Sequence, residues 1–385
     1  MTDTATEKLA AAAERDLDLI IADLRRIVEL ETPSHERPLL SAGLDGIETW
    51  LAERLGAPSD RARYGGGAYG DVLELTYPGT APGSVLFLSH YDTVWPGGTL
   101  AEWPVTINGD SLTGPGCFDM KAGIVHSVWV LRLLRELGLP HPEVRMLLTG
   151  DEEIGSPASR PHIERASEGV DLTLVLEPSR EGMVKSRRKG MGLFDVEVRG
   201  VESHAGLDPA AGASAVHALA EVLPRITALS APDRGTTVNV GTVSGGTGRN
   251  VVAGRALCKV DVRVQEPEEM GRVDEGLAAL GVSDPRISVA VTGEWNRPPM
   301  NPNPPSERAF ATLREVADDL GVRLGETAVG GASDANLVSA LGRPVLDGLG
   351  AVGAGPHSRD EHLLVSRTPH QIAVVAGLLE RMVRG

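Results

Sequence analysis

The chain alternates between two kinds of hydrophobic pattern. In some stretches apolar residues recur every three or four positions, which predicts amphipathic helices over residues 7–31, 42–55 and 122–137. Elsewhere short apolar runs end in Gly, Pro or charged residues, which predicts strands over residues 72–77, 85–89, 144–148 and 172–176. Strands that alternate with helices indicate an α/β fold with a mainly parallel sheet flanked by helices.

The pattern changes after residue 188. Residues 192–198 alternate between apolar and polar positions, as a half-buried strand does. The segments that follow predict an α+β insert, with helices over 213–229 and 267–280 and strands over 236–243, 256–264 and 287–291. An insert of about 100 residues has the size of a small domain. We therefore expect a main domain formed by residues 1–188 and 299–385 and an inserted domain at 189–298, with a Pro- and Asn-rich return linker at 297–305.

Six acidic residues and histidines lie far apart in the sequence but at related places of the predicted fold. Four follow the end of a predicted strand, a fifth begins a predicted helix, and the sixth lies in a Gly-rich loop after a strand-like stretch. In that order they are His90, Glu152, Glu153, Glu177, Asp119 and His357. In open parallel sheets the carboxyl ends of the strands form the ligand crevice. We therefore expect the six side chains to converge on one edge of the sheet.

These residue types are typical of a metal site. Two histidines and several carboxylates, without a suitably placed cysteine pair, suit divalent metals, with zinc first. A carboxylate shared by two metals about 3.5–4 Å apart would form a centre that activates water and polarises a carbonyl. Asp92, two residues after His90, is a candidate to orient the imidazole. Taken singly, the acidic turn 151–153 could be solvated, His90 structural and Asp119 a helix N-cap, but six residues in compatible places make coincidence a poor explanation.

Composition argues against several classes of protein. The chain has 385 residues, a formal net charge of -16 and 3% aromatic residues, which argues against nucleic-acid binding because phosphate would be repelled. No apolar run approaches the length of a membrane span. The N-terminus lacks the pattern of a secretory signal, so we expect a cytoplasmic protein. The two cysteines, Cys117 and Cys258, give no disulfide framework.

Several segments together resemble a known family. They are Ser89-His-Tyr-Asp-Thr-Val94, Gly114-Pro-Gly-Cys-Phe-Asp-Met-Lys-Ala-Gly123, Thr149-Gly-Asp-Glu-Glu-Ile-Gly155, Leu176-Glu-Pro178, Ser203-His-Ala-Gly206 and Gly355-Pro-His-Ser358. In this order they resemble the co-catalytic zinc peptidase/aminoacylase family, which includes acetylornithine deacetylase, succinyl-diaminopimelate desuccinylase and bacterial glutamate carboxypeptidase. The chain looks most like the glutamate carboxypeptidase branch because of Asn296-Arg-Pro298, Gly330-Gly-Ala-Ser-Asp-Ala335 and Leu341-Gly-Arg-Pro-Val345.

The resemblance implies two metal ions that share Asp119. His90 and Glu177 would complete the ligands of one ion, and Glu153 and His357 those of the other. The peptide bond between Asp119 and Met120 would be cis, as it is in the family.

The resemblance also separates Glu152 from the ligands. Glu152 would bind neither ion, and would take a proton from the attacking water and pass it to the leaving amine. Asp92 would support His90.

The inserted domain resembles the lid and dimerisation domain of the family, which makes the main domain the catalytic one. His204 would then reach, from the partner subunit of a homodimer, toward the oxyanion that develops on the substrate. Asn250, Arg263, Arg297 and Gly331 would be substrate contacts. Two of these have ordinary alternatives, since residues 245–250 could be a mere turn and Arg263 the partner of a salt bridge.

The predicted reaction is metal-dependent hydrolysis of an amide that releases an amino acid. The substrate would be a small N-acyl amino acid or a short peptide with a C-terminal residue such as glutamate, because an arginine such as Arg297 binds a carboxylate bidentately. The cofactors would be two Zn²⁺ ions, with Co²⁺ or Mn²⁺ as alternatives. A di- or aminopeptidase with the same metal chemistry is the rival enzyme, and a non-catalytic metal-binding dimeric scaffold is the rival from another class.

Overall fold

The computed structural model describes residues 4–384, and the chain divides into two compact units. Unit 1 comprises Met1–Arg187, Asn301–Ala328 and Ser333–Gly385, and unit 2 comprises Arg188–Met300 and Val329–Ala332. Each unit has a hydrophobic core of its own. The chain thus passes from unit 1 to unit 2 at Arg188, returns at Asn301, and contributes the short segment Val329–Ala332 to unit 2 once more.

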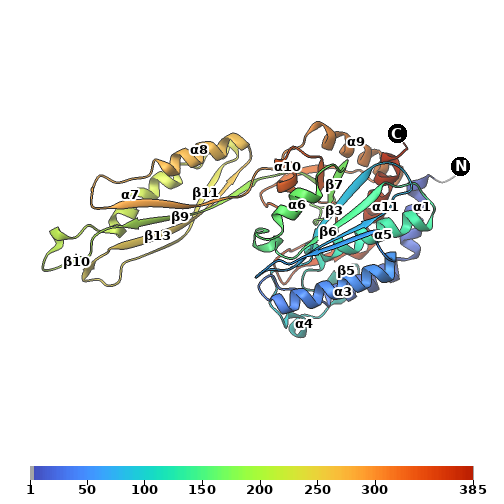
Figure 1. Ribbon diagram of the computed structural model, residues 1–385, viewed down its shortest axis with the longest axis horizontal. Coiled ribbons are helices and arrows are strands. Elements are labelled where there is room, and N and C mark those ends of the chain that lie inside the picture. The colour runs from blue at the N-terminus through green and yellow to red at the C-terminus, as the bar shows by residue number, and fades with distance from the viewer. Residues whose placement is uncertain (1–3, 385) are drawn as a thin grey trace. The chain divides into compact units, whose positions relative to one another are not determined.

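Unit 1 is built around an 8-stranded sheet (Figure 1). In spatial order its strands are β1 (Asp60–Tyr64), β2 (Val72–Tyr77), β6 (Glu143–Thr149), β3 (Ser84–His90), β7 (Leu172–Val175), β16 (Val345–Asp347), β8 (Val184–Arg188) and β15 (Glu326–Val329). The pairs of β3 with β6, β3 with β7 and β7 with β16 are parallel, whereas the pairs of β1 with β2, β2 with β6 and β16 with β8 are antiparallel. The predicted α/β fold is confirmed, with a parallel centre and antiparallel strands beside it.

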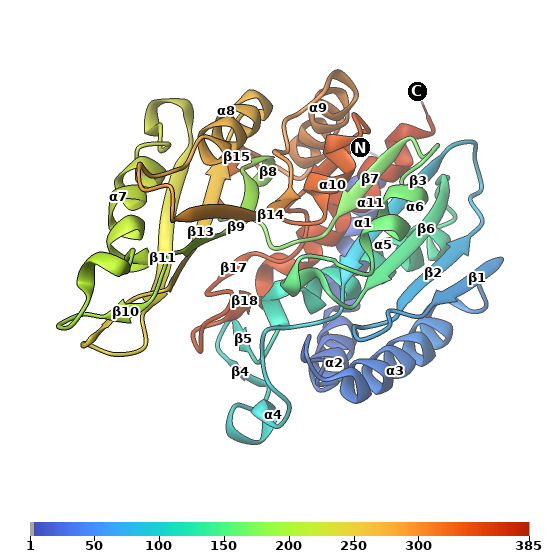
Figure 2. The same cartoon turned by 60° about the vertical axis from the view of Figure 1, so that its left-hand side comes forward.

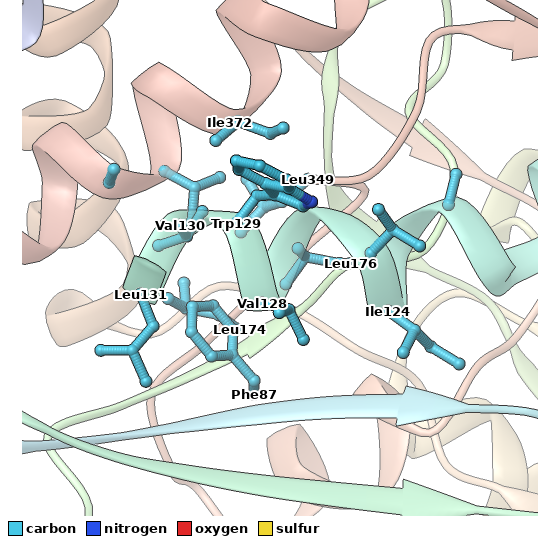
Figure 3. Packing of buried hydrophobic residues seen from close by; sticks show 14 of the residues in the cluster. Phe87, Ile124, Val128, Trp129, Val130, Leu131, Leu174, Leu176, Leu349 and Ile372 are labelled. Carbon is cyan, nitrogen blue, oxygen red and sulfur yellow. The ribbon is translucent and has the colours of Figure 1, made fainter. Parts of the chain in front are cut away.

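Helices pack around this sheet because its central strands are apolar on both faces. They are α1 (Ala5–Arg15), α2 (Leu17–Val28), α3 (Arg37–Leu55), α5 (Ala122–Glu136), α6 (Arg160–Ala166), α9 (Pro304–Asp319), α10 (Ala335–Ala340) and α11 (Thr368–Met382). Helix α5 is buried around nearly its whole circumference, as expected of a helix covered on both sides. Figure 3 shows why: its side chains contact Phe87 and Leu174 of the sheet below, and Trp129 lies near Ile372 of α11 above.

A small sheet lies beside the main one and joins distant parts of unit 1. It consists of β17 (Gly353–Ala354), β18 (His362–Leu364), β5 (Ser111–Thr113) and β4 (Thr106–Asn108), in that order (Figure 2). Strand β18 pairs antiparallel with β5, with His362 opposite Thr113. This pairing holds the loop before β18 against the loop after β5.

Unit 2 is an α+β layer pair. A 4-stranded antiparallel sheet runs in the order β11 (Thr237–Gly245), β13 (Arg255–Val264), β9 (Gly190–Arg199) and β14 (Ser288–Arg297). Alternate residues of β9 and β13 join the apolar faces of α7 (Ala215–Thr227) and α8 (Pro267–Ala278) in one core (Figure 2). The two-residue strands β10 (Ser203–His204) and β12 (Val251–Val252) pair separately.

Three details of the sequence prediction were wrong. The helix expected over 7–31 is two helices, because the backbone leaves helical geometry at Asp16, a residue type that helix interiors disfavour. The stretch 95–116, for which no helix or strand was predicted, contains α4 (Thr99–Glu102) and the strands β4 and β5, which are too short to show a period. The return linker is shorter than expected, since Arg297 still belongs to β14 and α9 begins at Pro304.

Two further findings bear on the class of protein. Within residues 4–384, no helix is both long and apolar enough to span a membrane. Cys117 and Cys258 are both buried and free.

Candidate metal centre

The register of the parallel strands places the candidate residues at one edge of the sheet in unit 1. His90 is the last residue of β3 and pairs with Thr149, the last residue of β6, while Leu88 pairs with Val175, the last residue of β7. Neighbouring strands lie about 4.8 Å apart. The residues just beyond β6 and β7, which include Glu153 and Glu177, therefore emerge on either side of His90.

Five of the predicted residues converge in two groups that share one carboxylate. His90, Asp119 and Glu177 form one group and Asp119, Glu153 and His357 the other; in each, the potential ligand atoms lie within 4.8 Å of one another. His90 Nε2 is 3.3 Å from Asp119 Oδ1 and 3.5 Å from Glu177 Oε1. His357 Nε2 is 3.0 Å from Glu153 Oε2 and 3.4 Å from Asp119 Oδ2. Asp119 thus turns one oxygen toward each group.

Asp119 lies in an irregular turn ahead of α5. Its backbone is extended (φ -113°, ψ 101°), and its peptide bond to Met120 is cis, as the family resemblance implied. Helix α5 begins three residues later, at Ala122, and its N-cap is Lys121. The alternative that Asp119 is a helix N-cap was therefore wrong.

Hydrogen bonding leaves the outer nitrogen of His90 available as a ligand. Nδ1 of His90 lies 3.0 Å from the backbone carbonyl of Asp92. A carbonyl oxygen only accepts hydrogen bonds, so in the neutral imidazole that can bind a metal ion the proton is on Nδ1 and the lone pair is on Nε2, which faces Asp119 and Glu177. The support that Asp92 gives to His90 thus comes mainly from its main chain, since its carboxylate is farther away, at 3.5 Å.

The Asp92 carboxylate instead holds the acidic turn. Its Oδ1 accepts a hydrogen bond from the backbone N–H of Glu152 (3.2 Å), and its Oδ2 accepts one from that of Glu153 (3.3 Å) and one from Ser34 Oγ (2.8 Å). Asp92 is fully buried. One side chain therefore fixes the backbone of both glutamates to the end of β3.

Asp151, the first acid of the turn, points elsewhere. Its Oδ2 accepts hydrogen bonds from the backbone N–H groups of Ala158 (2.6 Å) and Ser159 (3.1 Å). Burial raises its pKa to about 6, although these hydrogen bonds act in the opposite direction. Of the three adjacent acids, two therefore remain for the centre.

The charges of the centre call for a cation. Burial lowers the pKa of His90, but the carboxylates of Asp119, Asp92 and Glu177 raise it more, and Asp119 and Glu153 raise the pKa of His357 to about 10. Burial and the charge of Asp119 raise the pKa of Glu153 to about 7, against the effect of His357. Without a metal ion, protons thus compensate the clustered carboxylates.

The donor set fits a divalent metal ion at each group. Each offers one imidazole and two carboxylates, which suits zinc and related ions. Among the residues described, the buried atoms His90 Nε2 and Glu153 Oε1 meet no hydrogen-bond partner of acceptable geometry. Buried polar atoms are rarely left so, and bound metal ions would satisfy both.

In unit 2 the structure brings two of the predicted residues together. Ala205, next to His204, donates its N–H to the backbone carbonyl of Asn250 (3.0 Å). Nδ1 of His204 accepts hydrogen bonds from the N–H groups of Gly206 (3.1 Å) and Leu207 (3.0 Å). With Nδ1 acting as the acceptor, the proton is on Nε2, so His204 is an exposed hydrogen-bond donor.

The other predicted substrate contacts lie away from His204 within unit 2. Arg263 of β13 and Arg297 of β14 both pair with Met191 of β9, so they flank the same position of the sheet. This position is at the C-terminal end of β13, whereas β12 precedes its N-terminal end. Arg263 forms a bidentate ion pair with Asp261 (2.8 and 2.9 Å), which was its alternative interpretation. Arg297 is 2% exposed and donates to Asn296 Oδ1 (3.1 Å). The carbonyl of Gly331 accepts from Arg188 Nη1 (3.0 Å).

Glu361 is a residue of the centre that the sequence reasoning missed. It is fully buried, and its carboxylate accepts hydrogen bonds from the backbone of the loop that carries Asp119. The sequence feature that could have pointed to Glu361 is its position four residues after His357, in the same Gly-rich loop. That signal is weak, because the partners of Glu361 lie more than 240 residues away in the sequence.

Comparison with known proteins identifies the family. The sequence profile of peptidase family M20/M25/M40 matches residues 86–381. The chain belongs to this family. As an M20 peptidase, it is a metal-dependent enzyme that hydrolyses amide bonds and releases amino acids.

Relatives of known sequence agree with this class. The chain is 28% identical to carboxypeptidase G2 of a Pseudomonas species over 383 residues, which cover 96% of this chain and 91% of that protein. It is 29% identical to the succinyl-diaminopimelate desuccinylase of Variovorax paradoxus, covering 79% of this chain and 83% of that protein. This M20 peptidase is therefore similar to hydrolases of both peptides and N-acyl amino acids.

Solved structures support the fold. Aminopeptidase PepT of Bacillus cereus matches with a TM-score of 0.77 at 20% identity, covering 94% of this chain and 98% of that one. A tripeptidase of Staphylococcus aureus matches with a TM-score of 0.78 at 20% identity, covering 96% of this chain and 99% of that one. At such identities the likeness concerns the M20 fold and not the substrate.

Proposed function

We propose that this M20 peptidase uses two divalent metal ions, in the first place Zn²⁺, to release an amino acid with a free carboxylate from N-acyl amino acids or short peptides. The observation that carries the proposal is the pair of ligand groups that share Asp119. His90 and Glu177 would complete the ligands of one ion, and Glu153 and His357 those of the other. When bound, the ions would activate a water molecule and polarise the scissile carbonyl.

Glu152 would serve as the proton carrier. It directly precedes the proposed ligand Glu153 on the acidic turn, and its backbone N–H donates to Asp92 Oδ1. We propose that its carboxylate accepts the proton of the attacking water and donates it to the leaving amine nitrogen. General acid–base catalysis of this kind contributes about 10²- to 10⁴-fold in rate.

His204 would stabilise the oxyanion, reaching from the partner subunit of a homodimer formed through unit 2. Two backbone N–H groups hold its Nδ1, which directs the Nε2 proton outward as a neutral donor. Such a donor is preorganised for the developing negative charge of the carbonyl oxygen. Asn250, in the turn just before β12, would assist.

The substrate carboxylate would be bound by arginine. Arg297 would bind it, and Arg263, which flanks the same position of β9 and is paired with Asp261, would be a further substrate contact. Since a guanidinium recognises a carboxylate bidentately, we favour a C-terminal amino acid product, with glutamate first. Gly331 would contribute backbone contacts. A cytoplasmic location stays a prediction from the N-terminal sequence.

A di- or aminopeptidase is the second candidate function. Aminopeptidase PepT and a tripeptidase share the fold, so the fold by itself does not distinguish the two candidates. The two candidates differ in the substrate group that they read, since an aminopeptidase requires a free α-amine and a carboxypeptidase or aminoacylase a free carboxylate.

A paired substrate panel tests the proposal. N-acyl and peptidyl derivatives of glutamate, aspartate and neutral amino acids would be compared with the same compounds blocked at the amine or at the carboxylate. We expect blocking the carboxylate to abolish hydrolysis and blocking the amine to leave it, and a chelator to abolish it in all cases. The reverse dependence would favour the aminopeptidase, and hydrolysis that survives thorough metal removal would exclude the mechanism.

A further inference from the structure

Glu361 sits at the junction of two loops that carry proposed metal ligands. It follows His357 by four residues, and two backbone hydrogen bonds tighten the stretch between them, from Ser358 N–H to the carbonyl of Gly355 (3.1 Å) and from Glu361 N–H to that of Ser358 (3.0 Å). The pairing of β18 with β5 brings this stretch against the loop that leads to Asp119. Glu361 therefore belongs to one ligand segment and faces the other.

Donors from the facing loops occupy all the hydrogen-bond acceptor positions of its carboxylate. Oε1 accepts from the N–H groups of Phe118 (2.9 Å) and Asp119 (3.0 Å). Oε2 accepts from the N–H of Gly116 (3.1 Å) and from Trp95 Nε1 (2.9 Å). An ionised carboxylate has about four acceptor positions on its two oxygens, and here four donors meet it.

Neither glutamine nor aspartate, the two most similar side chains, can accept the same four hydrogen bonds. A glutamine amide has one accepting oxygen, and its NH₂ group would face two N–H donors, which leaves those donors unsatisfied in a buried site. An aspartate is one methylene shorter. Because one of the four donors is the N–H of Asp119 itself, any loss of these bonds reaches the proposed bridging ligand directly.

We propose that Glu361 is a positioning residue that fixes Asp119 relative to His357 and so sets the metal affinity of the centre. This inference rests on the proposed function, because it needs Asp119 and His357 to be ligands. Residues that orient metal ligands from outside typically change affinity by about 10- to 100-fold when replaced. We expect an effect of that size for Glu361→Gln.

The experiment measures metal binding and not only activity. Wild type and Glu361→Gln would be stripped of metal, titrated with Co²⁺ in competition with a chelator, and examined by visible spectroscopy of the bound Co²⁺. The matched control is Asp360→Asn, which removes the same charge from the exposed neighbouring side chain. We expect about 10- to 100-fold weaker Co²⁺ binding and a shifted spectrum for Glu361→Gln only.

The outcomes separate this inference from the proposed function. Equal affinity and equal spectra in Glu361→Gln and wild type would overturn the positioning role, even if the variant unfolds at a lower temperature. Wild type that binds no Co²⁺ would overturn both proposals. If Glu361→Gln does not fold, Trp95→Phe decides, because it removes one donor and keeps an aromatic ring: weaker binding supports the role, and unchanged binding overturns it.

Discussion

At the scale of single residues, Glu152 and Glu153 are neighbours with different proposed roles. If Glu152 carries the proton and binds no ion, Glu152→Gln lowers kcat by about 10²- to 10⁴-fold while metal content stays the same. Steady-state kinetics and metal analysis by mass spectrometry check this. Glu168→Gln, an exposed glutamate, is the control. A variant that loses a metal ion would instead mark Glu152 as a ligand.

His126 predicts a pH dependence of stability that is separate from catalysis. It is buried in α5, its two ring nitrogens have no partner among the described residues, and burial lowers its pKa from 6.5 to about 4. The unfolded chain therefore binds a proton more readily than the folded one. The stability that a neutral His126 allows is present above pH 6.5 and is lost as the pH falls toward 4.

His126→Leu should remove this loss. We expect the variant to gain about 2 kcal/mol of unfolding free energy relative to wild type between about pH 7.5 and about pH 5. Urea unfolding at the two pH values measures it. His35→Leu, at an exposed position, should follow wild type, and parallel pH profiles for all three proteins would contradict the assignment.

At the scale of elements, α5 has to approach the end of β7 closely. A Cβ atom added at Gly123 would lie 2.1 Å from the carbonyl oxygen of Leu176, the residue before Glu177. Gly123→Ala must therefore push α5 away from a proposed metal ligand. We expect a loss of about 1–3 kcal/mol in stability, together with weaker metal binding.

A second helical glycine provides the control for Gly123. Gly271 in α8 is exposed, and a Cβ atom there would meet nothing within 4 Å. Gly271→Ala should raise stability by about 0.5–1 kcal/mol, because alanine favours the helix. Thermal unfolding and metal titration of both variants measure the difference in stability and in metal affinity. Equal effects of the two substitutions would show that helix propensity alone accounts for them.

At the scale of the whole molecule, metal binding should stabilise the fold. Asp119, Glu153 and Glu177 converge in a largely buried site, and an ion bound only by the folded chain adds its binding free energy to stability. Removing metal with a chelator should lower Tm by several degrees, and Zn²⁺ but not Mg²⁺ should restore it. Calorimetry checks this, and an unchanged Tm would argue against occupied ligand groups.

A homodimer with His204 acting across subunits should allow complementation. Glu152→Gln and His204→Ala would each be nearly inactive alone. In a mixed dimer, one site would have an intact Glu152 and receive an intact His204 from its partner, so about a quarter of wild-type activity should return after subunit exchange. Kinetics of the mixture and sedimentation check this. A dimeric mixture that stays inactive would place His204 in its own subunit's site.

How much could be predicted differs between parts of the chain. Long periodic segments such as 122–137 were read correctly because one helix face, or here almost a whole helix, is apolar. The strand β2 was predicted but its antiparallel direction was not, because direction depends on the partner strand. The strands β4 and β5 were missed because a strand of three residues has no period, and only its partners define it. Direction and pairing are properties of the sheet and not of the segment.

The sequence by itself determined the α/β class and the identities of the acids and histidines at strand ends, because periodicity and strand ends depend on residues that are close together in the sequence. Only the tertiary structure decided which of those side chains meet. In the folded chain Asp151 accepts a hydrogen bond from Ala158 and not from the centre, the carboxylate of Asp92 accepts one from the acidic turn, and Glu361 accepts one from the loop of Asp119. The physical reason is that these contacts depend on hydrogen bonds between segments far apart in the chain, which form only when the strands pair.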